Sequence, residues 1–187
     1  MKFFLLLILL LTAFALCGQD NKAAAAVECA WSYILTDEFS GKEKRALLPR
    51  RFFGYTPEAQ RRFFLEQDYL ECEGYLIESD GKVVLHLRFT YQDKEAEKQV
   101  GTISPGATIT LSSLKGKLLT FTTFKGAEVE KKGDLTIYES SYAIPKSAIK
   151  TLKNFEINTI LVNWSKGIQT YEVYYVDFLS EQLRCLE

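Results

Sequence analysis

Cysteines are the residues with the most definite chemistry in this sequence, because exported cysteines form disulfides. Cys29 opens the first predicted strand and Cys185 ends the last predicted element, so a bridge between them would join the two ends of the fold. In the chain-entropy model, closing so long a loop stabilises a fold by about 5 kcal/mol. A Cys29–Cys72 bridge is the main alternative. The third possibility is that Cys29, Cys72 and Cys185 are all buried free thiols.

The single histidine, His86, is the base that a serine or cysteine triad would need. It falls on the polar face of a predicted strand, and no serine stands in a Gly-x-Ser-x-Gly context. We therefore interpret His86 as an exposed histidine without a catalytic role. Zinc-ligand spacing and a glycine-rich phosphate loop are also absent from the sequence. The sequence thus predicts no catalytic residue, no metal site and no cofactor.

Charged residues gather in two neighbouring segments. A basic segment, residues 42–62, precedes an acidic segment, residues 68–80, which lacks calcium-loop spacing. We interpret the basic segment as solvated and balanced by the acidic one; the alternative is a surface for an anionic membrane or polysaccharide. With 23 basic and 24 acidic residues, the chain has no basic excess that would favour nucleic acid. The acidic residues could alternatively include a pair that faces across a cleft, which is the arrangement that glycoside hydrolases use.

Tyrosines are the candidate ligand-binding residues. Tyr171, Tyr174 and Tyr175 fall in one predicted strand. Tyrosine combines apolar area with a polar hydroxyl, and it is common where proteins bind sugars or other proteins. Plain packing is the alternative, because tyrosine is also a good strand former.

The N-terminus has the parts of a secretory signal peptide. Lys2 supplies a positive charge, Phe3–Leu11 is an unbroken apolar run, and small and mixed residues follow. The run is shorter than the roughly 20 apolar residues that span a bilayer. We therefore predict a signal peptide at residues 1–18 and no transmembrane segment in the mature chain. A lipid anchor at Cys17 is the alternative, which the bulky Leu16 disfavours.

Period-two patterns predict that residues 28–187 form a single β-rich domain after a flexible leader at residues 19–27. The first strand, residues 29–36, is predicted to be half-buried. Further strands are predicted at 69–78, 82–91, 108–114, 117–124, 135–144, 156–164 and 168–176, with helices at 57–67, at 146–153 and from 178. Short turns between strands make the pairing antiparallel. The predicted fold class is α+β and β-rich: a mostly antiparallel sheet or sandwich of about eight strands with two or three short helices.

Four short motifs resemble a group of small exported proteins of Bacteroidota-type bacteria. The motifs are Glu28-Cys29-x-x-x-Tyr33, Asp37-Glu38-Phe39-x-Gly41-Lys42, Ile144-Pro145-x-Ser147 and Leu183-x-Cys185-Leu186. The likeness covers most of the mature chain. Those proteins are uncharacterised, so the resemblance implies a periplasmic or surface location and brings no activity or catalytic residue.

These observations predict an exported, non-enzymatic domain that binds a protein or glycan partner of the cell envelope. The predicted location is the periplasm, the cell surface or the extracellular space. One alternative is a carboxylate-based hydrolase of an envelope or extracellular polymer, and another is a structural part of an envelope assembly. Two carboxylates facing each other in a pocket would favour the hydrolase. A flat aromatic patch would favour binding, and an exposed apolar edge strand would favour an assembly.

Overall fold

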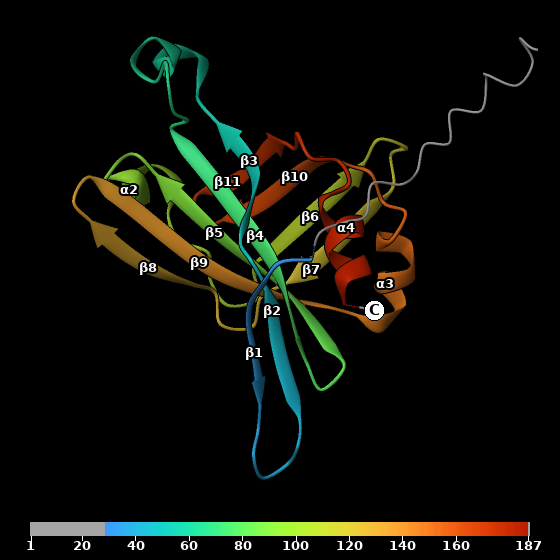
Figure 1. Cartoon of the computed structure of the whole chain (residues 1–187). Coiled ribbons are helices and arrows are strands. Elements are labelled where there is room, and N and C mark those ends of the chain that lie inside the picture. The colour runs from blue at the N-terminus through green and yellow to red at the C-terminus, as the bar shows by residue number, and fades with distance from the viewer. Residues whose placement is uncertain (1–28, 187) are drawn as a thin grey trace, which may run out of the picture.

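The computed structural model describes residues 29–186. The predicted signal peptide, the leader at residues 19–27 and the lipid-anchor alternative at Cys17 therefore lie outside the described residues. Within the described part, eleven strands form two antiparallel sheets, with three α-helices and one 3-10 helix (Figure 1). The predicted β-rich α+β class is confirmed, with more strands than expected.

The larger sheet contains seven strands. They are β1 (Trp31–Thr36), β2 (Glu43–Leu47), β3 (Arg50–Tyr55), β4 (Leu70–Ser79), β5 (Lys82–Tyr91), β8 (Ala127–Lys132) and β9 (Leu135–Ile144). Their order is β1-β2-β4-β5-β9-β8, and β3 also pairs with β4. The long strands β4, β5 and β9 lie side by side at the centre of this sheet.

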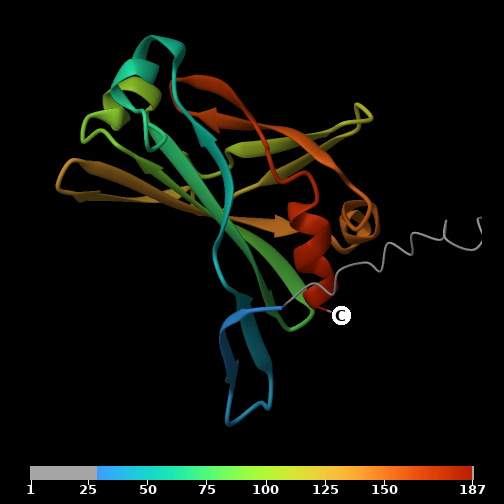
Figure 2. The same cartoon turned by 45° about the horizontal axis from the view of Figure 1, so that its top comes forward.

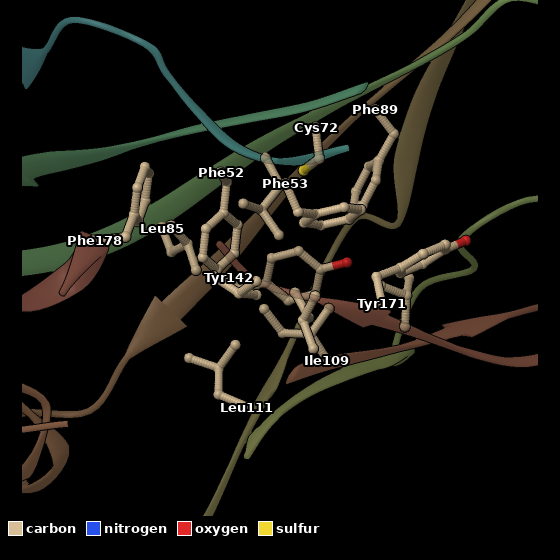
Figure 3. Close-up of a cluster of buried hydrophobic side chains, with 14 of the residues drawn as sticks. Phe52, Phe53, Cys72, Leu85, Phe89, Ile109, Leu111, Tyr142, Tyr171 and Phe178 are labelled. Carbon is tan, nitrogen blue, oxygen red and sulfur yellow. The ribbon is translucent and has the colours of Figure 1, made fainter. Parts of the chain in front are cut away.

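The smaller sheet has four strands in the order β11-β10-β6-β7. Their bounds are Thr108–Ser113 for β6, Leu118–Thr122 for β7, Ile157–Trp164 for β10 and Gly167–Glu172 for β11. Its inner face packs on the larger sheet: the Trp164 ring lies 5.3 Å from Phe89 in an edge-on contact. The Tyr171 ring likewise stacks on Phe53 at 4.9 Å, and Figure 3 shows both Phe53 and Tyr171 in this aromatic core.

Strict alternation explains why β5 was predicted with its observed bounds, whereas β9 was bounded by the turn at residues 132–134 and by Pro145. In β5 every second residue is buried, so Leu85, Leu87 and Phe89 face the core while His86 and Arg88 face outward. A strand with one buried face has its register fixed by that pattern, because a shift of one residue would reverse both faces.

The helices are short. They are α2 (Ala96–Val100), α3 (Lys146–Leu152), α4 (Phe178–Cys185) and the 3-10 helix η1 (Glu58–Phe63). The Phe178 ring of α4 stacks on Phe52 at 4.4 Å. Gly74 in β4 permits this approach, because a Cβ there would lie 3.1 Å from Phe178 Cζ. Within residues 29–186, every helix is too short or too polar to cross a membrane.

The hairpin formed by β1 and β2 projects from the body of the molecule, as Figure 2 shows. The strand predicted at residues 29–36 is present as β1, but its burial is only partial: Trp31 and Tyr33 are partly buried, whereas Leu35, on the same predicted face, is exposed because β1 is an edge strand. No second sheet covers this hairpin, so alternation in the sequence does not produce a buried face here.

The predicted helix at residues 57–67 is also wrong. η1 is a single 3-10 segment with no buried residue, and the Phe63 side chain is exposed. The Thr56-Pro57 start signal is present, but of the two phenylalanines on the predicted apolar side only Phe64 packs, edge-on against Tyr69, while Phe63 faces solvent. The strands β2, β3 and β8 were not predicted, because their sequences are rich in charged residues and lack the alternation of apolar and polar residues that marks a strand.

Candidate functional site

The disulfide joins Cys29 to Cys185, with Cα atoms 5.5 Å apart. The Cys29–Cys185 prediction is confirmed. The Cys29–Cys72 rival is wrong, because Cys72 is a buried free thiol in β4. Burial raises the pKa of the Cys72 thiol well above its ordinary value, so it remains protonated and unreactive at neutral pH.

Four side chains of the basic segment, Lys42, Arg45, Arg50 and Arg51, pair with carboxylates, which supports the interpretation from the sequence in part. Arg45 makes the best-buried of these pairs: its guanidinium lies 2.6 Å from Glu78 and donates to the Leu186 carbonyl at 2.7 Å. The other pairs are Lys42–Asp80, Arg50–Glu181 and Arg51–Asp68. These pairs link β2, β3 and β4 and compensate much of the basic charge. Lys44 and Arg62 instead lie over the rings of Tyr33 and Phe63.

The three predicted binding tyrosines do not share a face. Tyr171 lies in β11 and is buried in the core, whereas Tyr174 and Tyr175 follow the end of that strand and are 69% and 55% exposed. The prediction that all three stand on one strand is therefore wrong, because β11 ends at Glu172. Only Tyr171 joins a pocket.

That pocket, which we call the tyrosine pocket, has a volume of about 250 Å³ and no charged side chain in its lining. Its described lining residues are Tyr55, Pro57, Tyr69, Tyr91, Gln99, Val100, Gln169, Thr170 and Tyr171. They come from the ends of β3 and β5, the start of β4, the helix α2 and the strand β11, which meet at one end of the sandwich (Figure 1).

A chain of hydrogen bonds orders the pocket. The Tyr91 and Tyr171 hydroxyl oxygens lie 3.1 Å apart, and the Tyr171 hydroxyl donates to Gln169 Oε1 at 2.6 Å. On the other wall, the Tyr69 hydroxyl lies 3.1 Å from Gln99 Oε1. The same hydroxyl lies 3.1 Å from Asp93 Oδ2, which also accepts from Gln99 Nε2 at 2.7 Å. These contacts fix the orientation of both carboxamide groups.

Burial keeps these phenols protonated. Desolvation is the largest cause that raises the pKa of Tyr171, to about 12. It also raises the pKa of Tyr91 and of Tyr69, and the neighbouring Asp93 raises that of Tyr69 further. The pocket therefore offers neutral hydroxyl and carboxamide groups over the whole physiological pH range.

Tyr55 supplies the accessible aromatic surface of the pocket. Its side chain is 39% exposed, and its ring meets Tyr171 edge-on with centroids 5.3 Å apart. A ring held on edge by a buried neighbour keeps one face available for a ligand at little cost in side-chain entropy.

A second pocket, the His86 groove, lies on the outer face of the larger sheet and has a volume of about 280 Å³. Its lining consists of Val84, His86, Thr123, Phe124, Lys125, Gly126, Glu128, Glu139, Ser141 and Ala143. The prediction of an exposed His86 needs correction, because its side chain is only 16% exposed. His86 Nδ1 lies 3.0 Å from Ser141 Oγ, and its ring contacts Tyr75 with centroids 4.8 Å apart.

Sequence reasoning missed most of these residues. Gln99 and Gln169 carry no motif, and nothing in the chain marks them as neighbours. The His86–Ser141 contact follows from the register of β5 and β9, in which these two residues are directly opposite. No group of three or more His, Cys, Asp or Glu side chains within residues 29–186 could hold a metal ion.

Comparison with known proteins leaves the site to be interpreted from its own geometry. No protein-family model, no curated protein and no solved structure matches this chain.

Proposed function

We propose that this chain is an exported domain that binds a neutral glycan in the tyrosine pocket. The observation that carries the proposal is the uncharged lining in which four tyrosines and two glutamines meet. Phenol and carboxamide groups donate and accept hydrogen bonds, as sugar hydroxyls do, and the Tyr55 ring offers an apolar surface for the C–H face of a pyranose. A pocket with a few convergent polar groups and aromatic walls is typical of small-ligand sites.

The disulfide supports the proposed location. Disulfides persist in oxidising compartments and are rare in reducing ones. The Cys29–Cys185 bridge therefore favours export to the periplasm, the cell surface or the extracellular space, where envelope and extracellular glycans are the ligands within reach.

The carboxylate hydrolase has weaker support. Glu128 and Glu139 are directly opposite in the β8–β9 register and both line the His86 groove, so they project from the same sheet face. Glycoside hydrolysis needs two acids flanking the scissile bond from opposite sides. The tyrosine pocket has no carboxylate in its described lining, which favours binding over hydrolysis at that site.

An assembly role is a second candidate, and the edge strand β1 favours it. Its sequence, WSYILT, has no charge and no proline, and Ile34 and Leu35 are exposed. Edge strands of proteins that remain monomeric commonly carry a charged residue or a proline, which hinders pairing with another chain. If β1 pairs with another chain, sedimentation velocity will show a concentration-dependent oligomer that Ile34→Lys abolishes; a monomer at all concentrations would exclude self-assembly through this edge.

Glycan binding is tested on an array of neutral and acidic envelope and extracellular oligosaccharides, probed with the exported protein. We expect selective binding to neutral members. Tyr55→Ala should weaken that binding at least about tenfold, because it removes the accessible ring. Tyr174→Ala is the matched control: this tyrosine is exposed outside the pocket, so binding should be unchanged.

Two results would contradict the proposal. One is the absence of any neutral glycan bound above background. The other is binding that Tyr174→Ala abolishes and Tyr55→Ala leaves intact.

A further inference from the structure

His86, Ser141 and Glu139 lie close together on the outer face of the larger sheet. They line the His86 groove and not the tyrosine pocket. Ser141 lies opposite His86 in β9, and its Oγ is 3.0 Å from His86 Nδ1. The other ring nitrogen, Nε2, lies 3.9 Å from Glu139 Oε2. A histidine between a hydroxyl and a carboxylate is the arrangement that activates a serine nucleophile.

The surroundings of His86 favour the tautomer that this role requires. A carboxylate beside Nε2 stabilises the proton on that nitrogen, which leaves the Nδ1 lone pair to accept the Ser141 hydroxyl proton. Burial lowers the pKa of His86 below its ordinary value, against the opposing effect of Glu139 and Glu128. The imidazole is therefore neutral at pH 7 and available as a base.

Ser141 is also accessible. It is exposed and lines the His86 groove. The loop before β8 supplies the facing wall, with the exposed Phe124 ring and the Lys125 ammonium. Gly126 shapes this loop: its φ is +77°, and a Cβ there would lie 2.5 Å from the Ile103 carbonyl oxygen.

We propose that Ser141 and His86 form a nucleophile–base pair that hydrolyses an acyl ester bound in the His86 groove. Ser141 Oγ bonds to the ester carbonyl carbon as its proton passes to His86 Nδ1. The bond to the alcohol oxygen breaks, and His86 returns the proton to the departing alcohol. Water then attacks the acyl-serine by the same proton route, which releases a carboxylic acid and restores Ser141.

The groove indicates the substrate class. Val84 and Ala143 form an apolar floor, and Phe124 forms an apolar wall, which suits a short acyl chain. Lys125 is the cationic side chain in the groove's lining, and a cation stabilises the negative charge that develops on the carbonyl oxygen. The chemistry is thus that of a short-chain carboxylic ester, such as an O-acyl group.

The test uses an alkyl fluorophosphonate probe and p-nitrophenyl butyrate with the exported protein. The probe should attach to Ser141, as located by mass spectrometry of the digested protein. Ser141→Ala should reduce labelling and ester hydrolysis to background. His86→Gln should lower both rates at least about 100-fold, the usual contribution of a general base.

Ser32→Ala is the matched control, because Ser32 is an exposed strand serine outside the groove, and both rates should stay at the wild-type level. The labelling site in the wild-type protein decides the proposal even if a variant fails to fold. No adduct, an adduct on another residue, or hydrolysis that persists in a folded Ser141→Ala protein would overturn it.

Discussion

The side-chain oxygen of Gln182 on α4 accepts a hydrogen bond from the backbone N–H of Leu76 in β4, at 2.7 Å. β4 changes partner at this point: it pairs with β3 up to Gly74 and with β2 from Ile77. The Gln182 side chain therefore takes the place of a neighbouring strand in the interval between the two. Its amide nitrogen completes the arrangement by reaching the Gly74 carbonyl at 3.5 Å.

Replacing this carboxamide should destabilise the fold. Gln182→Ala leaves the buried Leu76 N–H without a partner, and an unsatisfied buried backbone group costs about 1–3 kcal/mol. Chemical denaturation should show that decrease in the free energy of unfolding. Arg184→Ala, on the exposed side of the same helix, should change it by less than about 0.5 kcal/mol. Equal effects of the two variants would contradict the role given to Gln182.

Loss of the disulfide should also destabilise the protein. The bridge spans 156 residues, and a loop of that length corresponds to about 5 kcal/mol in the chain-entropy model. We expect Cys29→Ser/Cys185→Ser to unfold at a lower denaturant concentration than the wild type. A reducing agent should lower the wild-type midpoint and leave that of the double variant unchanged. A reducing agent without effect on the wild type would show that the bridge does not stabilise the fold.

Two glycines with similar backbone angles should respond differently to a methyl group. Gly126 has φ +77° and Gly116 has φ +75°, but only Gly126 has backbone atoms within reach of a Cβ. Gly116→Ala should cost about 1–2 kcal/mol, from the left-handed conformation alone. Gly126→Ala should cost clearly more, because Ile103 must also move. Thermal unfolding of both variants measures the difference, and equal melting temperatures would contradict it.

The stability of the protein should fall in mild acid because of His86. Burial lowers the pKa of His86 in the folded state below its ordinary value of 6.5. The unfolded chain then binds a proton more readily than the folded one, so stability is present above pH 6.5 and decreases as the pH falls below it. Urea unfolding at pH 7.5 and 5.5 should show a larger loss for the wild type than for His86→Gln. An identical loss in both proteins would contradict this origin.

Local patterns predicted the parts of the fold that carry their own periodicity. Residues 82–91 were predicted with the bounds of β5 because alternation marks both faces of that strand. Residues 135–144 were predicted with the bounds of β9 because a turn at residues 132–134 precedes them and Pro145 follows. β2 and β3 lie in the basic segment and were missed, since their strand character comes from pairing with β4. A local sequence pattern does not show which strand another strand pairs with.

The sites were less predictable than the fold. The Cys29–Cys185 bridge followed from the positions of the two cysteines at the ends of the predicted domain. Tyr171 was named as a binding residue, but its burial beside Phe53 depends on how the two sheets pack. Gln169 and Gln99 approach the pocket from β11 and α2, which are distant in sequence. Such convergence follows from topology, which a single sequence does not specify.

The most direct test of glycan binding in the tyrosine pocket is an NMR titration of the protein labelled with ¹⁵N at its glutamine side chains. The neutral oligosaccharide selected on the array is added to saturation. The account predicts that the side-chain amide resonances of Gln99 and Gln169 shift, while that of Gln182, buried between α4 and β4, stays in place. Unchanged Gln99 and Gln169 resonances at saturation would contradict it, because the ligand would then be bound elsewhere.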